Sequence, residues 1–188
     1  MFTHRIRKII FLISITLAAS GGIGAYVYYV TSNQGPIYDF NPTRDTQAVM
    51  DIFNKNWYWL LASPESSPAF MIKNRTYDTN PLHFGSLHIK VLYIKDKLAG
   101  FTAYHLGNPP QQGRILFVAV DHEFRGKGYG KILAEYAMKE LFAMGVTHLA
   151  LWTRVNNLPA QRIYKNLGFK EIFDENGPNM SGPFCCAL

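Results

Sequence analysis

The sequence predicts an α/β (α+β) domain with a mixed, mostly antiparallel central sheet, flanked by helices and preceded by one transmembrane helix. Three observations lead to this prediction. An uncharged, apolar run occupies residues 9–30. Two β-rich runs follow one another in the middle of the chain, which is typical of an antiparallel hairpin. Beyond them the pattern alternates strand, helix, strand and helix, which favours helices packed on a sheet.

The composition excludes several classes of protein. Aromatic residues make up 14% of the 188 residues, a content that disordered chains do not reach. The two cysteines are the neighbours Cys185 and Cys186, so they do not form a disulfide framework. The net charge is +6, but residues 1–30 hold three basic residues and no acid, which leaves +3 for the remainder. We therefore expect no nucleic-acid partner.

Residues 9–30 are the expected membrane anchor. They number 22 and carry no formal charge, and about 20 helical residues cross a hydrocarbon core of roughly 30 Å. Arg5, Arg7 and Lys8 precede the run, and this basic flank favours a single-pass membrane protein with a cytoplasmic N-terminus. A cleaved signal peptide and a buried helix of a soluble protein are the alternatives. The orientation of the following domain stays open.

The chain divides into the basic flank with its anchor (1–30), a linker (31–36) and one domain (37–188). In the first half of the domain, Thr43 is the expected N-cap of a helix that reaches Trp57, because apolar residues recur there at helical spacing. A second, short helix is expected near residue 70. The further segments expected in this half are the strands Ile37–Phe40, His88–Ile94 and Leu98–His105, the helix Phe70–Lys73 and the hairpin turn Lys95–Lys97.

In the second half, Ile115–Val120 reads as a strand buried on both faces, because it is almost continuously apolar. A helix follows and ends at Gly145. Asn157 is the expected cap of another helix, which ends at Gly168. The further expected strands are Thr147–Thr153, Phe169–Phe173 and Pro183–Leu188. A ligand of such a sheet binds beyond the carboxyl ends of the central strands, which selects the loops after Val120 and Thr153.

The loop after Val120 carries a glycine motif. Residues 125–131 read Arg-Gly-Lys-Gly-Tyr-Gly-Lys, and three glycines in five residues let the backbone approach a ligand closely. A helix then begins with its free amides and positive dipole end at the same place, which is typical of a phosphate or pyrophosphate site. The spacing matches neither a Walker loop nor the dinucleotide-binding fingerprint. The alternative is a flexible glycine turn with solvated lysines.

A second motif follows about thirty residues later, with Asn157, Ala160 and Tyr164 before Gly168 and Phe169. Together the two motifs resemble those of the GNAT acetyltransferase superfamily, over roughly Ile115–Ile172. The resemblance implies a GNAT-like fold with acetyl-CoA as co-substrate, held by the amides of the glycine loop and the edge of the preceding strand. The residues that it assigns to this site are Phe117, Val118, Val120, Arg125, Gly126, Lys127, Gly128, Tyr129, Gly130, Lys131, Asn157 and Ala160.

The resemblance also implies that Tyr164 is catalytic, because the family uses a tyrosine here to protonate the thiolate of departing CoA. Tyr164 lies seven residues after Asn157 and therefore on the same helix face. The alternative is a core aromatic residue. The general base is less defined: His122, His105 and a water relay are the candidates, since a histidine titrates in the required range and the strand Ile115–Val120 contains no carboxylate.

The resemblance implies an N-acetyltransferase that moves acetyl from acetyl-CoA to a primary amine by direct transfer in a ternary complex. The acceptor is a small molecule or a protein, and its pocket is expected between the helix Thr43–Trp57 and the loop 75–87. A non-catalytic, membrane-tethered module that binds CoA is the alternative. No Cys/His spacing suggests a metal site. The expected membrane partner is contacted through the N-terminal helix.

Overall fold

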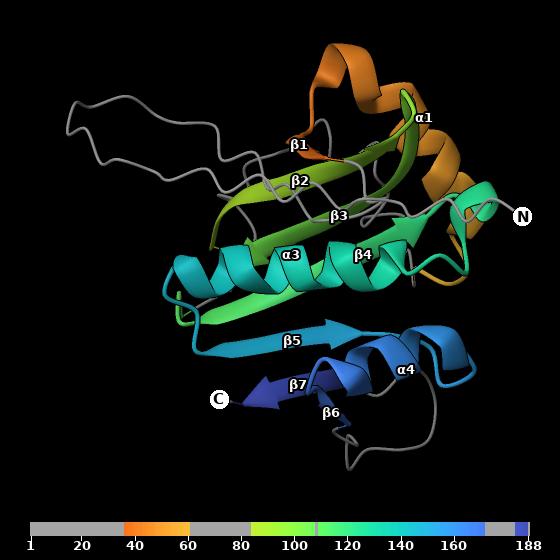
Figure 1. Ribbon diagram of the computed structural model, residues 1–188. Coiled ribbons are helices and arrows are strands. Elements are labelled where there is room, and N and C mark those ends of the chain that lie inside the picture. The colour runs from red at the N-terminus through yellow and green to blue at the C-terminus, as the bar shows by residue number, and fades with distance from the viewer. Residues whose placement is uncertain (1–35, 61–83, 108, 172–182, 188) are drawn as a thin grey trace, which may run out of the picture.

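The computed structural model describes residues 36–60, 84–107, 109–171 and 183–187. Within these ranges, seven strands form one sheet in the order β1-β2-β3-β4-β5-β7-β6, and only the β4–β5 pair is parallel (Figure 1). This confirms the predicted mixed, mostly antiparallel sheet flanked by helices. The elements are β1 (Ile37–Asp39), α1 (Pro42–Asn56), β2 (Phe84–Ile94), β3 (Lys97–Leu106), β4 (Gln112–Val120), the 3₁₀ turn η2 (His122–Phe124), α3 (Tyr129–Ala143), β5 (His148–Trp152), α4 (Leu158–Asn166), β6 (Lys170–Glu171) and β7 (Pro183–Ala187).

The helix α1 begins two residues earlier than its predicted cap implies. The side chain of Asn41 accepts hydrogen bonds from the amides of Thr43 (2.9 Å) and Arg44 (3.2 Å), so Asn41 is the N-cap and the prediction of Thr43 was wrong. The physical reason is Pro42, which is pre-organised for the first helical position and holds the preceding residue extended. Trp57 lies just past the helix and is 58% exposed.

The hairpin of β2 and β3 turns through two residues. Lys95 and Asp96 both have positive φ angles (48° and 62°), and Ile94 pairs directly with Lys97. Two consecutive left-handed residues match the right-handed twist of the flanking strands, which explains a shorter turn than the predicted Lys95–Lys97. Both strands are longer than predicted.

Among the described helices, α3 and α4 pack on one face of the sheet and α1 on the other. In Figure 1, α3 crosses the sheet over β3 and β4. The helix α4 contacts α3, and its Tyr164 belongs to the same core as Leu149 and Leu151 of β5. The helix α1 packs on the opposite side, where Phe53 meets Phe117 of β4 edge to face at 5.3 Å between ring centroids. Leu133 and Leu141 of α3 are fully buried in the other core.

The strand β4 is not buried on both faces, which corrects the prediction. Ile115, Phe117 and Ala119 are buried, but the residues between them are only half-buried. The pairing with β3 also shifts: Tyr104 pairs with Ile115 and Ala103 with Phe117, so Leu116 is an extra residue. This bulge redirects the side chains of β4, because it breaks the strict alternation of faces.

The C-terminal strands are arranged in an order that the sequence did not predict. The strand β7 lies between β5 and β6 and pairs with both in antiparallel fashion.

The predicted cap of α4 is confirmed, since the Asn157 side chain accepts a hydrogen bond from the amide of Ala160 (3.4 Å).

Several predictions fall outside the described residues: the anchor and its basic flank (1–30), the helix Phe70–Lys73 and most of the loop 75–87. Among the residues that are described, no helix has the length and apolar character needed to cross a membrane.

Replacing Asn41 with alanine is expected to lower the free energy of unfolding by about 1 kcal/mol, because two amides of α1 lose their acceptor. Thr43→Ala is the matched control, with an expected change within about 0.5 kcal/mol. Urea unfolding followed by circular dichroism measures both. An equal loss in the two variants contradicts the assignment of the cap.

Candidate acetyl-transfer site

The parallel strands β4 and β5 are paired over only part of their length. The pairing runs from Gln112 with His148 to Ile115 with Leu151 and then stops, and the two strands diverge toward their carboxyl ends (Figure 1). Within the described residues, no strand pairs with the β5-facing edge of residues 116–120. The backbone groups of that edge are therefore available to an extended ligand.

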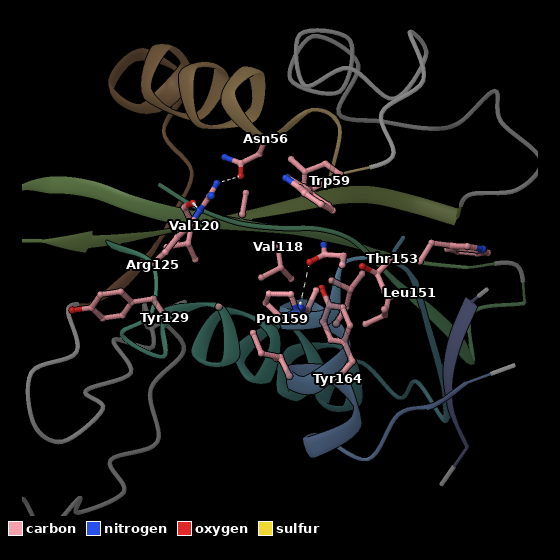
Figure 2. A pocket seen from close by; sticks show the side chains of 18 of the residues that line it. Asn56, Trp59, Val118, Val120, Arg125, Tyr129, Leu151, Thr153, Pro159 and Tyr164 are labelled. Carbon is pink, nitrogen blue, oxygen red and sulfur yellow. Dashed lines mark hydrogen bonds between the residues drawn. The ribbon is translucent and has the colours of Figure 1, made fainter. Parts of the chain in front are cut away.

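A cavity of about 630 Å³ occupies the split between the two strands. It extends through the sheet, because α1 contributes lining residues from one face and α3 and α4 from the other (Figure 2). This volume lies in the range of small-molecule sites. The lining residues that the sequence assigned to the site are Val118, Val120, Arg125, Gly126, Gly128, Tyr129, Gly130, Asn157, Ala160 and Tyr164.

The glycine loop forms one end of this cavity. Gly126 and Gly128 have φ angles of +75° and +86°, a conformation that glycine adopts without steric cost. A Cβ atom at either position would meet nothing within 4 Å, so the backbone faces open space. Gly128 caps α3 without a side-chain hydrogen bond, and the first turn of α3 contains no acid. The free amides of this helix end therefore suit an anion.

The basic side chains of the motif are held by protein partners. Arg125 donates to the carbonyl of Val120 (3.3 Å) and to the side chain of Asn56 in α1. Lys127 donates to a backbone carbonyl of η2 (2.9 Å) and Lys131 pairs with Glu135 (3.5 Å). Arg125 lines the cavity, whereas Lys127 and Lys131 do not. The backbone of the loop is therefore the main feature presented to an anion.

Tyr164 reaches the cavity from the second turn of α4. Pro159 and the Asn157 cap start this helix at the mouth of the cavity, and Figure 2 shows the tyrosine ring pointing from α4 toward the split strands. Tyr164 is 8% exposed, and burial raises the pKa of its hydroxyl above the usual value near 10. It also packs edge to face on Phe169, so its ring belongs to the core while it lines the cavity.

The two histidines considered as general base lie elsewhere. His122 is exposed in η2, pairs with Asp121 (3.0 Å) and does not line the cavity. His105 is fully buried in β3, and its ring is hydrogen-bonded to the carbonyl of Leu106. In the described part of the chain, the cavity lining contains no Asp, Glu or His, and no group of side chains is arranged to hold a metal.

The predicted role of Phe117 is as part of the strand edge, which depends on its backbone and not on its side chain. Its side chain packs on Phe53, in the core on the α1 face, and only its backbone belongs to the open edge. Tyr104 points to α3, where its hydroxyl donates to Glu140 (3.3 Å). Which face a strand residue uses depends on the local register, and the sequence pattern does not reveal a bulge.

Sequence reasoning missed several lining residues. From α1 and the turn after it come Asn56, Trp59 and Leu60, and from the end of β5 come Trp152 and Thr153. The sequence does contain one sign of these residues, a run of three aromatic residues at 57–59 directly after the polar residues 54–56. Neighbouring aromatic residues at such a polar helix end often indicate a binding surface and not a packed core.

Comparison with known proteins agrees with this geometry. The model of the acetyltransferase (GNAT) family matches residues 46–169. The [ribosomal protein bS18]-alanine N-acetyltransferase of Salmonella typhimurium is 28% identical over 60% of this chain and 79% of its own length. The mycothiol acetyltransferase of Saccharomonospora viridis is 30% identical over 71% of this chain. The match covers 45% of that enzyme, so the chain spans less than half its length.

Solved structures support the fold. The ribosomal-protein-alanine N-acetyltransferase of Brucella melitensis superimposes with a TM-score of 0.62 at 17% identity, over 81% of this chain and 99% of the other. A Bacillus subtilis acetyltransferase in complex with CoA gives a TM-score of 0.58 at 20% identity, over 82% and 99%. The family model matches about two thirds of the residues of this chain. The chain therefore belongs to the acetyltransferase (GNAT) family and is an acyltransferase.

Proposed function

We propose that this protein transfers an acetyl group from acetyl-CoA to a primary amine, directly and within a ternary complex. The observation that carries the proposal is the conjunction, in one cavity, of an open strand edge, a helix N-terminus without a side-chain cap and the buried side chain of Tyr164. The relatives named above differ in the acceptors that their names specify, so we take from them only the transfer of acetyl.

The donor side fits a ligand that is extended at one end and anionic at the other. The unpaired edge of residues 116–120 is suited to the two amides of a pantetheine arm, as an added strand would be. The amides of Gly126–Gly130 are suited to a pyrophosphate at the end of that arm. Pro159 and Ala160 of α4 would contact the pantetheine arm on the side opposite β4.

Tyr164 is proposed as the proton donor. Direct transfer forms a C–N bond and breaks the thioester C–S bond, and the sulfur leaves with the electron pair and needs a proton. A phenol is neutral at physiological pH and carries the proton to be donated. Burial raises the pKa of Tyr164. The same surroundings disfavour a bare thiolate, so they also favour transfer of the proton to sulfur.

The proton of the attacking amine is assigned to water. The lining residues described here include no Asp, Glu or His, and His122 faces solvent beside Asp121. Water in the open cavity provides a path for that proton. Of the three candidates for the general base, His122, His105 and a water relay, we therefore propose the water relay. The acceptor enters from the α1 face, because the glycine loop and α4 take up the other side.

Gly128→Ala is expected to weaken CoA binding at least tenfold, since alanine at a φ of +86° costs about 1–2 kcal/mol and shifts the loop backbone. Gly145→Ala is the matched control: its φ is +88° and it also faces open space, but it follows the far end of α3, about 22 Å away. Calorimetry with CoA and the full-length chain compares them. Equal affinities in both variants and the parent chain contradict the donor site.

Tyr164→Phe is expected to lower kcat between about 100-fold and 10,000-fold, with little change in the affinity for acetyl-CoA. Tyr136→Phe, on α3 and outside the cavity lining, is the control and should retain the parent rate. The assay is release of free thiol in the presence of an amine. If Tyr164→Phe turns over at the parent rate, Tyr164 is not the proton donor, and a chain that binds CoA without any turnover is the non-catalytic module.

We also propose, from the sequence pattern alone, that residues 1–30 anchor the domain to a membrane. Full-length chain in isolated membranes should stay in the pellet after carbonate extraction, because 22 uncharged residues partition strongly into the bilayer. Release of the chain into the supernatant would show that the segment is not an anchor. Protease protection in intact cells then reports on which side the domain lies.

A further inference from the structure

We propose that the acceptor amine carries an aromatic or similarly flat apolar group, which binds at the α1 end of the cavity against Trp59 and Trp152. This inference deepens the proposed acetyl transfer and rests on it. Both tryptophans line the same cavity, one from the turn after α1 and the other from the end of β5.

Trp59 lies on the α1 side of the cavity, from which we expect the acceptor amine to approach. In Figure 2, Trp59 and Asn56 lie on one side of the sheet, and Tyr164 and Pro159 on the other. The glycine loop and α4 would enclose the donor on the Tyr164 side. An amine that attacks the acetyl group must approach from the remaining direction, which passes Trp59 and Leu60.

The two indoles are more exposed than most of the apolar residues that line the cavity. Trp59 and Trp152 are each 39% exposed, whereas Ile115, Leu151 and Tyr164, which line the same cavity, are buried. Indoles offer large flat faces that an aromatic ligand stacks on or packs against edgewise. Covering such faces is favourable, because apolar area is removed from water.

The described side chains at the α1 end of the cavity do not suit a ligand with several positive charges. The described lining residues include no carboxylate, so a second ammonium group of a diamine would find no counter-charge there. Three cations near this end are engaged with protein groups. Arg125 is bound to Asn56, Arg114 lies over the ring of Trp152, and Arg154 lies over the ring of Tyr58 at 4.1 Å and donates to the Tyr58 carbonyl. A monoamine with an apolar body fits this distribution better than a polyamine.

Both indoles are held in place before any acceptor binds. Trp152 is covered on one face by the guanidinium of Arg114, 4.6 Å from the ring centroid. Trp59 packs edge to face on Tyr58 at 5.0 Å, and Tyr58 is tied to the loop after β5 by Arg154 and by Asn156, whose side chain donates to the tyrosine hydroxyl (3.4 Å). Such pre-organisation lowers the entropy cost of binding.

The test compares four amines with the full-length chain and acetyl-CoA: phenethylamine and tryptamine against ethylamine and putrescine. We expect kcat/KM for the two aromatic amines to exceed that for the aliphatic ones at least tenfold. In Trp59→Ala this ratio should fall close to one, whereas Trp59→Phe should keep most of it. Trp57→Ala is the matched control, because Trp57 is an exposed neighbour outside the cavity lining and should keep the full ratio.

The outcomes separate this inference from the proposed function. Turnover of all four amines at similar kcat/KM, or a ratio unchanged by Trp59→Ala, overturns the aromatic acceptor and leaves acetyl transfer intact. Calorimetry of phenethylamine against the CoA-saturated chain supplies a readout without turnover, with binding expected for the parent and at least tenfold weaker binding for Trp59→Ala. Absence of phenethylamine binding overturns the inference, whereas absence of CoA binding overturns the proposed function.

Discussion

Pairing between β4 and β5 ends at Ile115 and Leu151, and the cavity begins where that pairing ends. The bulge at Leu116 falls at the same point, and a bulge bends its strand and increases the local twist. The bent strand leaves β5, so its edge loses a partner and its half-buried side chains face the cavity. The glycine loop follows β4 after the short turn η2, so its position depends on the direction that the bend imposes. The open strand edge, the glycine loop and the cavity therefore share one structural origin.

The C-terminal end of α1 and the turn after it contact both sides of the split between β4 and β5. Asn56 accepts from Arg125 of the glycine loop, and Lys55 lies 3.5 Å from Asp121 just before that loop. Two residues later, Tyr58 contacts Arg154 beyond β5. The ion pair is partly exposed and contributes little by itself, but the three contacts together join both walls of the cavity to one helix end. A change in that helix end would therefore affect the glycine loop and the loop after β5 alike.

The site residues that the sequence identified are those that local backbone chemistry places. Gly126 and Gly128 have positive φ angles, and the conformation of their own loop is enough to place them. Asn157 caps α4 and Tyr164 lies two turns further along the same face, so this helix alone sets their relative position. His122 is a candidate base by sequence because it lies just past the strand β4, but its side chain is exposed to solvent, because the geometry of the turn η2 decides its direction. The side chain of Phe117 points to the α1 core, because a one-residue bulge sets the register there, while its backbone lies in the open strand edge.

By itself the sequence determined the class of fold, the helix cap at Asn157, the place of the glycine loop and the family resemblance, since each depends on short-range patterns of glycine, capping and apolar residues. Only the tertiary structure decided that β7 inserts beside β5, that β4 bulges and leaves its neighbour, and that Trp59 and Trp152 line the same cavity. These features depend on contacts between residues far apart in the chain. The physical reason is that strand pairing and packing are non-local, so no window of sequence contains both partners.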